Sequence, residues 1–220
     1  MNVRNHILRR FFLGCETGTI YKYFTDIDDI ADNPCISLSE RLAFLENQVA
    51  KAQKNLIPGI DLADTEKLNS FVILIETLIF DVKRSDIIFP WNLIDENLSR
   101  QGEAIFDLSG CSKIDPRLVG PAYKCLMYAD MAADVSEDAR NGLINFGTTD
   151  PEMWKLEIAY KSIGLIPFLL TALKNLSLLY KLLVLLYLAK TILFKISPII
   201  LNPKNIILFI HQPQFNPQEQ

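Results

Sequence analysis

Apolar residues recur along most of the chain at intervals of three or four positions, which is the period of an amphipathic α-helix. No segment alternates between apolar and polar residues between hairpin turns, and no repeat of roughly 20–50 residues occurs. The period predicts helices over residues 4–32, 37–54, 64–83, 90–110, 115–141 and 151–173, followed by a Leu/Ile-rich helical stretch over 176–210 that Pro198 and Pro203 interrupt. The chain is therefore predicted to be all-α and to form one domain.

The breaks between these segments carry helix-terminus signals. Asp32-Asn33-Pro34 ends the first segment, because proline cannot continue a helix and disfavours the helical conformation before it. Ser37 and Glu40 have the spacing of a capping box, which opens the second helix. Asn141-Gly142 is typical of a left-handed C-cap and closes the fifth.

The last part of the chain, residues 176–220, is rich in leucine, isoleucine and lysine. A membrane-spanning helix needs about 20 apolar residues with few charges. The uncharged runs 162–173 and 182–189 are shorter than this, and Lys174 and Lys181 separate them. A spanning helix is therefore not predicted. Two interpretations stay open: the tail is a buried helical part of the same domain, or it contacts a membrane surface.

The net charge of −4 averages two unlike parts of the 220-residue chain. Residues 161–220 hold six lysines and one acid, a net charge of +5, whereas residues 1–160 have a net charge of −9. Basic residues do not cluster with aromatic residues in a stripe, which argues against nucleic-acid binding. The acidic body fits a cation site, and the basic, apolar tail fits an anionic membrane surface.

Cysteine and histidine exclude several kinds of site. The four cysteines, at positions 15, 35, 111 and 125, form no C-x-x-C pair and are expected to be reduced and mostly buried. His6 and His211 lie at opposite ends of the sequence, so neither a zinc site nor a Ser-His-Asp triad is expected. The first apolar stretch is too short and broken for a signal peptide. These features predict a cytoplasmic protein, with peripheral contact at the cytoplasmic membrane face as an extension.

Two acidic clusters lie inside apolar helical segments. Asp28 and Asp32 are four positions apart and share one helix face. Asp130, Asp134 and Asp138 form a ladder with the same spacing. Carboxylates repel one another at this spacing and, when partly buried, need a neutralising cation. One such pair is common on a solvated helix face, but two pairs in separate apolar segments favour a shared cation.

Mg²⁺ suits these carboxylates. It is a hard cation that takes one or two carboxylates and completes its shell with water and phosphate oxygens. Two carboxylate pairs on facing helices would hold Mg²⁺ against a diphosphate and stabilise that leaving group as a C–O bond ionises. The acidic clusters therefore predict Mg²⁺ as the cofactor.

Three stretches resemble the squalene/phytoene synthase family, most closely its bacterial squalene/hydroxysqualene branch. Residues 21–34 (YKYFTDIDDIADNP) with 38–42 (LSERL) resemble the first aspartate motif, and 134–142 (DVSEDARNG) resembles the second. Residues 102–110 (GEAIFDLSG) resemble the helix that ends shortly before the second-motif helix. The resemblance covers about residues 8–145. It implies an isoprenoid-synthase-like all-α bundle around a central apolar cavity. It also implies a transferase of isoprenoid biosynthesis, which joins two prenyl diphosphates (farnesyl or geranylgeranyl) head to head with Mg²⁺ and releases diphosphate.

The same resemblance assigns roles to individual residues of a domain spanning 1–175, with 176–220 as its basic tail. The implied catalytic residues are Asp28, Asp32, Asp134 and Asp138, and the implied metal-binding residues are these four together with Asp29. Tyr21 matches a cavity tyrosine of the family and is expected to bind substrate. Arg140 is the nearest remaining cation to the expected diphosphate, and its alternative role is to complement a helix C-terminus.

Other positions depart from the family's pattern. Residues that usually bind diphosphate or line the pocket are replaced here by Thr25, Met127, Asp130, Ala133, Leu143 and Asn145. The bidentate fit of arginine to phosphate has no substitute at these positions. The chain is also short for the family. The alternative is therefore a catalytically inactive member that acts as a binding or assembly protein, or a decaying gene fragment.

Overall fold

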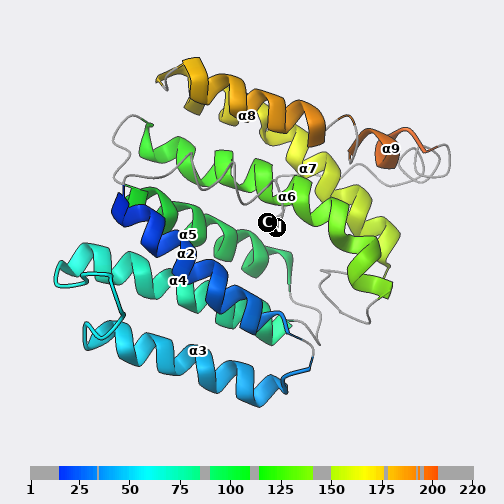
Figure 1. Cartoon of the computed structure of the whole chain (residues 1–220). Coiled ribbons are helices and arrows are strands. Elements are labelled where there is room, and N and C mark those ends of the chain that lie inside the picture. The colour runs from blue at the N-terminus through cyan, green and yellow to red at the C-terminus, as the bar shows by residue number, and fades with distance from the viewer. Residues whose placement is uncertain are drawn as a thin grey trace.

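The fold was analysed in a computed structural model, which describes residues 15–33, 35–84, 90–109, 114–140, 150–175, 178–191, 193 and 196–202. Within these ranges every regular element is helical, and the all-α prediction is confirmed. The elements, shown in Figure 1, are α2 (Cys15–Ala31), α3 (Leu38–Gln53), α4 (Thr65–Arg84), α5 (Trp91–Ser109), α6 (Pro116–Arg140), α7 (Pro151–Ala172), the 3-10 turn η1 (Leu173–Asn175), α8 (Leu178–Thr191) and α9 (Ser197–Ile200).

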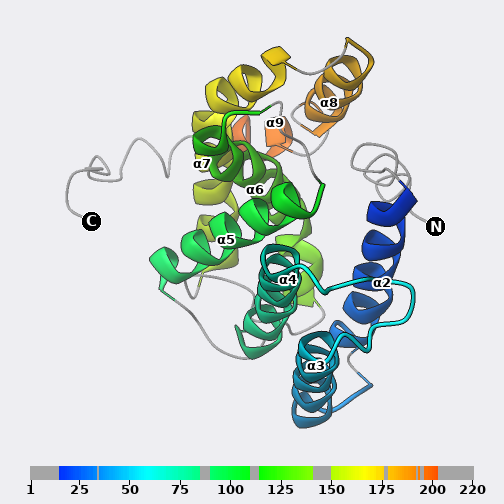
Figure 2. The same ribbon diagram turned by 90° about the vertical axis from the view of Figure 1, so that its left-hand side faces the viewer.

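Consecutive helices run in opposite directions, so the chain goes back and forth across the molecule (Figure 1). α3 packs on α4, α4 on α5, α5 on α6, and α6 on α7, while α2 lies against both α3 and α4. Figure 2 shows α3 at the bottom of this array and α7 and α8 at the top, with α2 at the right between them. Short antiparallel connections are the expected result of helices that follow one another closely in sequence.

The core consists of two large apolar clusters and a smaller one. The first joins α2, α3 and α4 around Phe71 and Ile75, which are fully buried. The second joins α5, α6, α7 and α9 around Tyr128 and Trp154. The third lies between α6 and the end of α7, and Val184 of α8 packs against it. Most of the apolar helix faces are buried in these clusters, whereas α8 leaves Leu182, Leu185 and Leu186 exposed.

The predicted helix ends are close to the observed ones where local signals define them. Ser37 Oγ accepts a hydrogen bond from the Glu40 backbone N–H at 3.3 Å, and the Glu40 carboxylate accepts one from the Ser37 N–H at 3.1 Å. This is the predicted capping box. The Leu/Ile-rich stretch over 176–210 contains two described helices, α8 and α9, and Pro198, one of the two prolines predicted to interrupt it, lies in the first turn of α9. The predicted C-cap at Asn141-Gly142 and the predicted helix over residues 4–14 lie outside the described residues.

One close approach sets the distance between α5 and α6. Gly102 of α5 is buried, and a Cβ at this position would lie 2.7 Å from Tyr123 Cβ and 2.9 Å from Tyr123 Cγ. Glycine therefore allows the two helices to pack at this crossing. Gly164 of α7 is the opposite case, because a Cβ there would meet nothing within 4 Å.

We predict opposite effects for the same substitution at these two helical glycines. Gly102→Ala forces Tyr123 and α6 to move, and is expected to lower the free energy of unfolding by about 1–3 kcal/mol. Gly164→Ala removes only the helix cost of glycine and is expected to raise it by about 0.5–1 kcal/mol. Urea unfolding followed by far-UV circular dichroism measures both. Equal stabilisation by the two substitutions would contradict the observed packing of α5 on α6.

Candidate functional site

The first aspartate cluster occupies the last turns of α2. Asp28, Asp29 and Asp32 are exposed to solvent, whereas Ile27 and Ala31 are 4% and 2% exposed and pack into the core with α3 and α4. The two buried side chains fix the rotation of the helix and so turn the three carboxylates away from this core.

An arginine of α3 makes a hydrogen bond to the C-terminal end of α2. Arg41 of α3 donates a hydrogen bond from Nη1 to the backbone oxygen of Ala31 at 2.9 Å. That oxygen belongs to the last turn of α2, where helix carbonyls have no partner within the helix and where positive charge is favourable. Arg41 thereby fixes the position of the backbone immediately before Asp32.

Tyr21 lies on the same stripe of α2 as the aspartates. The stripe runs through Tyr21, Thr25, Asp28 and Asp32, at spacings of four, three and four residues. Tyr21 and Thr25 are half-buried, and the Thr25 hydroxyl donates a hydrogen bond to the Tyr21 backbone oxygen at 3.1 Å. The stripe therefore goes from a partly covered tyrosine to exposed carboxylates within one helix.

The second aspartate cluster lies in the last turns of α6, which packs between α5 and α7. Asp130 is buried at 6% exposure, and Asp134, one turn later, is half-buried. Val135 is buried beside it. The side chains of Asp138 and Arg140 lie outside the described part of the chain. The carboxylates of Asp130 and Asp134 are thus more enclosed than those of α2.

The two clusters lie at the same end of the molecule. α2 and α6 run in the same direction, and in both views their C-terminal ends point to the same end of the array (Figures 1 and 2). Among the side chains that the structure describes, no three Asp, Glu, His or Cys residues gather closely enough to hold a metal ion. The joint Mg²⁺ site and the central apolar cavity stay predictions.

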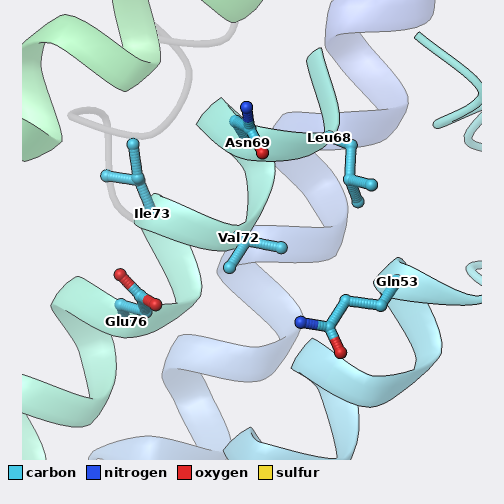
Figure 3. Close-up of a pocket in the computed structure, with 6 residues that line it drawn as sticks. All are labelled: Gln53, Leu68, Asn69, Val72, Ile73 and Glu76. Atoms are coloured by element: carbon cyan, nitrogen blue, oxygen red, sulfur yellow. The ribbon is translucent and has the colours of Figure 1, made fainter. Parts of the chain in front are cut away.

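A pocket that the structure does describe lies elsewhere. It has a volume of about 410 Å³ and opens between α3 and α4 (Figure 3). Gln53 comes from α3, and the other lining residues come from α4. Glu76, one of them, also pairs with Arg100 of α5 at 2.7 Å. None of the aspartates predicted to bind a metal lines this pocket.

A charged cluster that sequence reasoning did not single out lies between α5 and α6. Lys124 Nζ lies 2.8 Å from Asp95 Oδ2, and the Tyr128 hydroxyl donates a hydrogen bond to Asp95 Oδ1. Tyr128 is 1% exposed, and its burial raises the pKa of its hydroxyl far above the usual value. The neutral phenol is therefore a permanent donor to the Asp95 carboxylate.

Two aromatic rings and a third helix complete this charged cluster. Lys161 of α7 holds its ammonium 4.1 Å from the ring centroid of Trp91, and the Trp91 ring lies 5.2 Å from that of Tyr128. Burial lowers the pKa of Lys161, and the nearby carboxylates of Glu157 and Asp95 oppose that shift. The charged cluster thus ties α5, α6 and α7 together through two carboxylates, two ammonium groups and a cation–π contact.

The sequence does contain a signal for this cluster. Its members occur as pairs four positions apart on three helices, namely Trp91 with Asp95, Lys124 with Tyr128, and Glu157 with Lys161. Such a pair marks two residues on one helix face. It does not show which faces meet, and this is why only the structure reveals the cluster.

The described cysteines differ in their surroundings. Cys125 is fully buried, its thiol donates a hydrogen bond to the Ser162 backbone oxygen at 3.3 Å, and burial raises its pKa to about 11. Cys35 is exposed, which differs from the expectation of mostly buried thiols. Both are free, as expected for reduced cysteines. Cys125 therefore has a structural role between α6 and α7.

We predict that the bond from Tyr128 to a carboxylate is worth more than a similar bond to an amide. Tyr128→Phe is expected to lower the free energy of unfolding by about 1.5–3 kcal/mol, because it removes a buried hydrogen bond to a charged group. Tyr123→Phe removes a bond to the Gln101 side-chain oxygen at 2.8 Å and is expected to cost about 0.5–1.5 kcal/mol. Urea unfolding compares the two. A cost for Tyr128→Phe no greater than that for Tyr123→Phe would argue against the charge-assisted bond.

Comparison with protein-family models, with curated proteins and with solved structures gives no match to this chain.

Proposed function

We propose that the chain is a squalene/phytoene synthase-like prenyltransferase, which binds prenyl diphosphates with Mg²⁺ and joins two of them head to head. The observation that carries this proposal is the placement of the two aspartate clusters. They lie on separate helices, α2 and α6, whose C-terminal ends point to the same end of the molecule. The motif resemblance of residues 21–34 and 134–142 supports the same function.

The described residues suit Mg²⁺ in the way this ion is usually bound. Its ordinary protein ligands are one or two carboxylates, with water and substrate phosphate oxygens filling the other positions. Asp28 and Asp32 offer exposed carboxylates, and Asp134 a half-buried one. Mg²⁺ would neutralise the negative charge of the diphosphate as this group leaves.

The remaining parts of the proposal concern the chain's own groups. Asp29 and Asp138 extend the two aspartate sets, and Arg140 is the proposed partner of the diphosphate at the end of α6. Tyr21 is half-buried on the same stripe as Asp28, where its ring can contact the apolar prenyl chain while its hydroxyl stays near the polar end. The apolar interior of an all-α bundle is the proposed site for the rest of the prenyl chain.

A second candidate function is a binding or assembly protein of the same fold without catalysis. Two of the positions that depart from the family's pattern favour this second function. The hydroxyl of Thr25 bonds to the backbone of its own helix, and Asp130 is buried between packed helices. Neither position supplies the positive charge that a diphosphate needs.

The test of catalysis is release of diphosphate from labelled farnesyl or geranylgeranyl diphosphate by the purified chain with Mg²⁺. We expect release to stop when the metal is chelated. The double variant Asp28→Ala/Asp134→Ala is expected to lower the rate at least about a hundredfold, since it removes groups that stabilise the developing charge. Glu46→Ala/Glu103→Ala removes two exposed carboxylates from α3 and α5 and is expected to keep the rate.

Calorimetry with a prenyl diphosphate analogue separates the two candidates. Binding that requires Mg²⁺, together with diphosphate release, supports the transferase. Absence of both, with a protein that co-purifies with the chain, supports the assembly protein. A release rate that is the same in the aspartate double variant and in the intact chain would refute the assignment of these residues.

A further inference from the structure

Helix α8 presents apolar side chains to solvent. Leu182, Leu185 and Leu186 are 49%, 39% and 66% exposed, and Leu193, just beyond the helix, is 63% exposed. The first three are separated by three positions and one, so they lie on one side of the helix. Val184 packs the helix on α6 and α7. The described solvent side of α8 is therefore apolar where a surface helix usually has polar residues.

The second half of α7, which precedes α8 in the chain, also exposes apolar side chains. Ile163 and Phe168 are 37% and 45% exposed, with Gly164 and Pro167 exposed between them. α8 lies at the edge of the array beside α7, on the side opposite α3 (Figures 1 and 2). We refer to the exposed leucines of α8 and of the residue just beyond it as the lipid face: Leu182, Leu185, Leu186 and Leu193.

The segment that carries the lipid face holds charges of one sign. No acidic residue occurs between positions 158 and 218, a range that holds six lysines. Lys174 and Lys190 are exposed, and Lys190 follows Leu186 by four positions on α8, while Lys181 donates a hydrogen bond to the Lys174 backbone oxygen at 2.6 Å. Residues 1–160, in contrast, carry a net charge of −9. An anionic surface would attract this end of the molecule and repel the other.

From these observations we propose that the lipid face docks on the surface of an anionic lipid bilayer. The apolar side chains enter the boundary between headgroups and acyl chains, and the lysines lie at the level of the lipid phosphates. A second copy of the chain fits less well, because it would place lysines against lysines across the contact. No helix among the described residues is both long and apolar enough to cross a membrane. The docking does not depend on the proposed prenyl chemistry.

Sedimentation with lipid vesicles tests this docking on the full chain. We expect the chain to bind vesicles of phosphatidylcholine with about 30% phosphatidylserine. Binding to pure phosphatidylcholine is expected to be at least about fivefold weaker, because the attraction between the lysines and the anionic lipid is lost there. Leu185→Gln/Leu186→Gln is expected to weaken binding at least about tenfold, because it puts two amides at the apolar boundary. The matched control is Leu56→Gln/Leu93→Gln. Its leucines are also exposed, at 61% and 37%, but they belong to residues 1–160, the part of the chain with a net negative charge. The control is expected to bind as the intact chain does.

A charge variant tests the lysines separately and does not alter an apolar contact. Lys174→Glu/Lys190→Glu is expected to abolish the preference for phosphatidylserine. The control Lys54→Glu/Lys83→Glu changes two exposed lysines at the ends of α3 and α4 and is expected to keep this preference. Binding of the intact chain should also weaken from 0.1 to 0.5 M salt, about the range in which screening becomes strong.

Three results would overturn the proposal. The first is an intact chain that does not sediment with anionic vesicles. The second is equal binding by the leucine variant and its control, with circular dichroism showing that both are folded. The third is self-association in analytical ultracentrifugation that the leucine variant abolishes, because it would identify a second copy as the occupant of this face.

Discussion

The packing of α6 between α5 and α7 is the constraint on which the rest of the described structure depends. A helix covered on two sides needs small residues where its neighbours come close, and Ala129 and Ala132 of α6 are fully buried in this way. At the crossing with α5 the small residue is on the partner, Gly102. The resulting close contact brings Tyr128 within hydrogen-bond reach of Asp95. Apolar packing and a charged hydrogen bond therefore reinforce each other at one crossing.

This arrangement also determines what the second aspartate cluster can do. Asp130 is enclosed by the packed helices, and Asp134 is at the border between interior and solvent. The first cluster reaches a similar border by another route, since α2 is held by α3 and α4 and by the hydrogen bond from Arg41 to the end of the helix. Two independent sets of contacts thus bring acidic helix ends to one end of the molecule, which is the basis of the proposed diphosphate site.

The proposed diphosphate site and the proposed lipid face would serve one kind of substrate. Prenyl diphosphates combine a long apolar chain with a strongly charged group, and such molecules partition between water and bilayer. A protein that lies on the bilayer through α8 would meet its substrate at that boundary. The negative charge of residues 1–160 would keep the rest of the molecule off an anionic surface.

Local signals account for most of what could be predicted about the fold. The 3.6-residue period, the prolines and the Ser37 capping box predicted α3 to α7 nearly to their ends, because these features act within one or two turns. The tail was predicted to be interrupted at Pro198 and Pro203. Among the described residues α8 ends at Thr191 and α9 begins at Ser197, with Pro198 in its first turn, where a proline fits a helix best. The aspartate residues were identified from spacing and resemblance, but spacing alone could not say how closely α2 and α6 approach.

The sequence by itself determined where the helices form and which face of each is apolar. The tertiary structure decided which of those faces are covered. Asp95 and Tyr128 are 33 positions apart, and no local period shows that their faces meet. The apolar side of α8 has the same kind of pattern as the buried side of α4, yet one is exposed and the other is in the core. The reason is that periodicity measures the direction of side chains about one helix axis, whereas burial depends on the position of other helices.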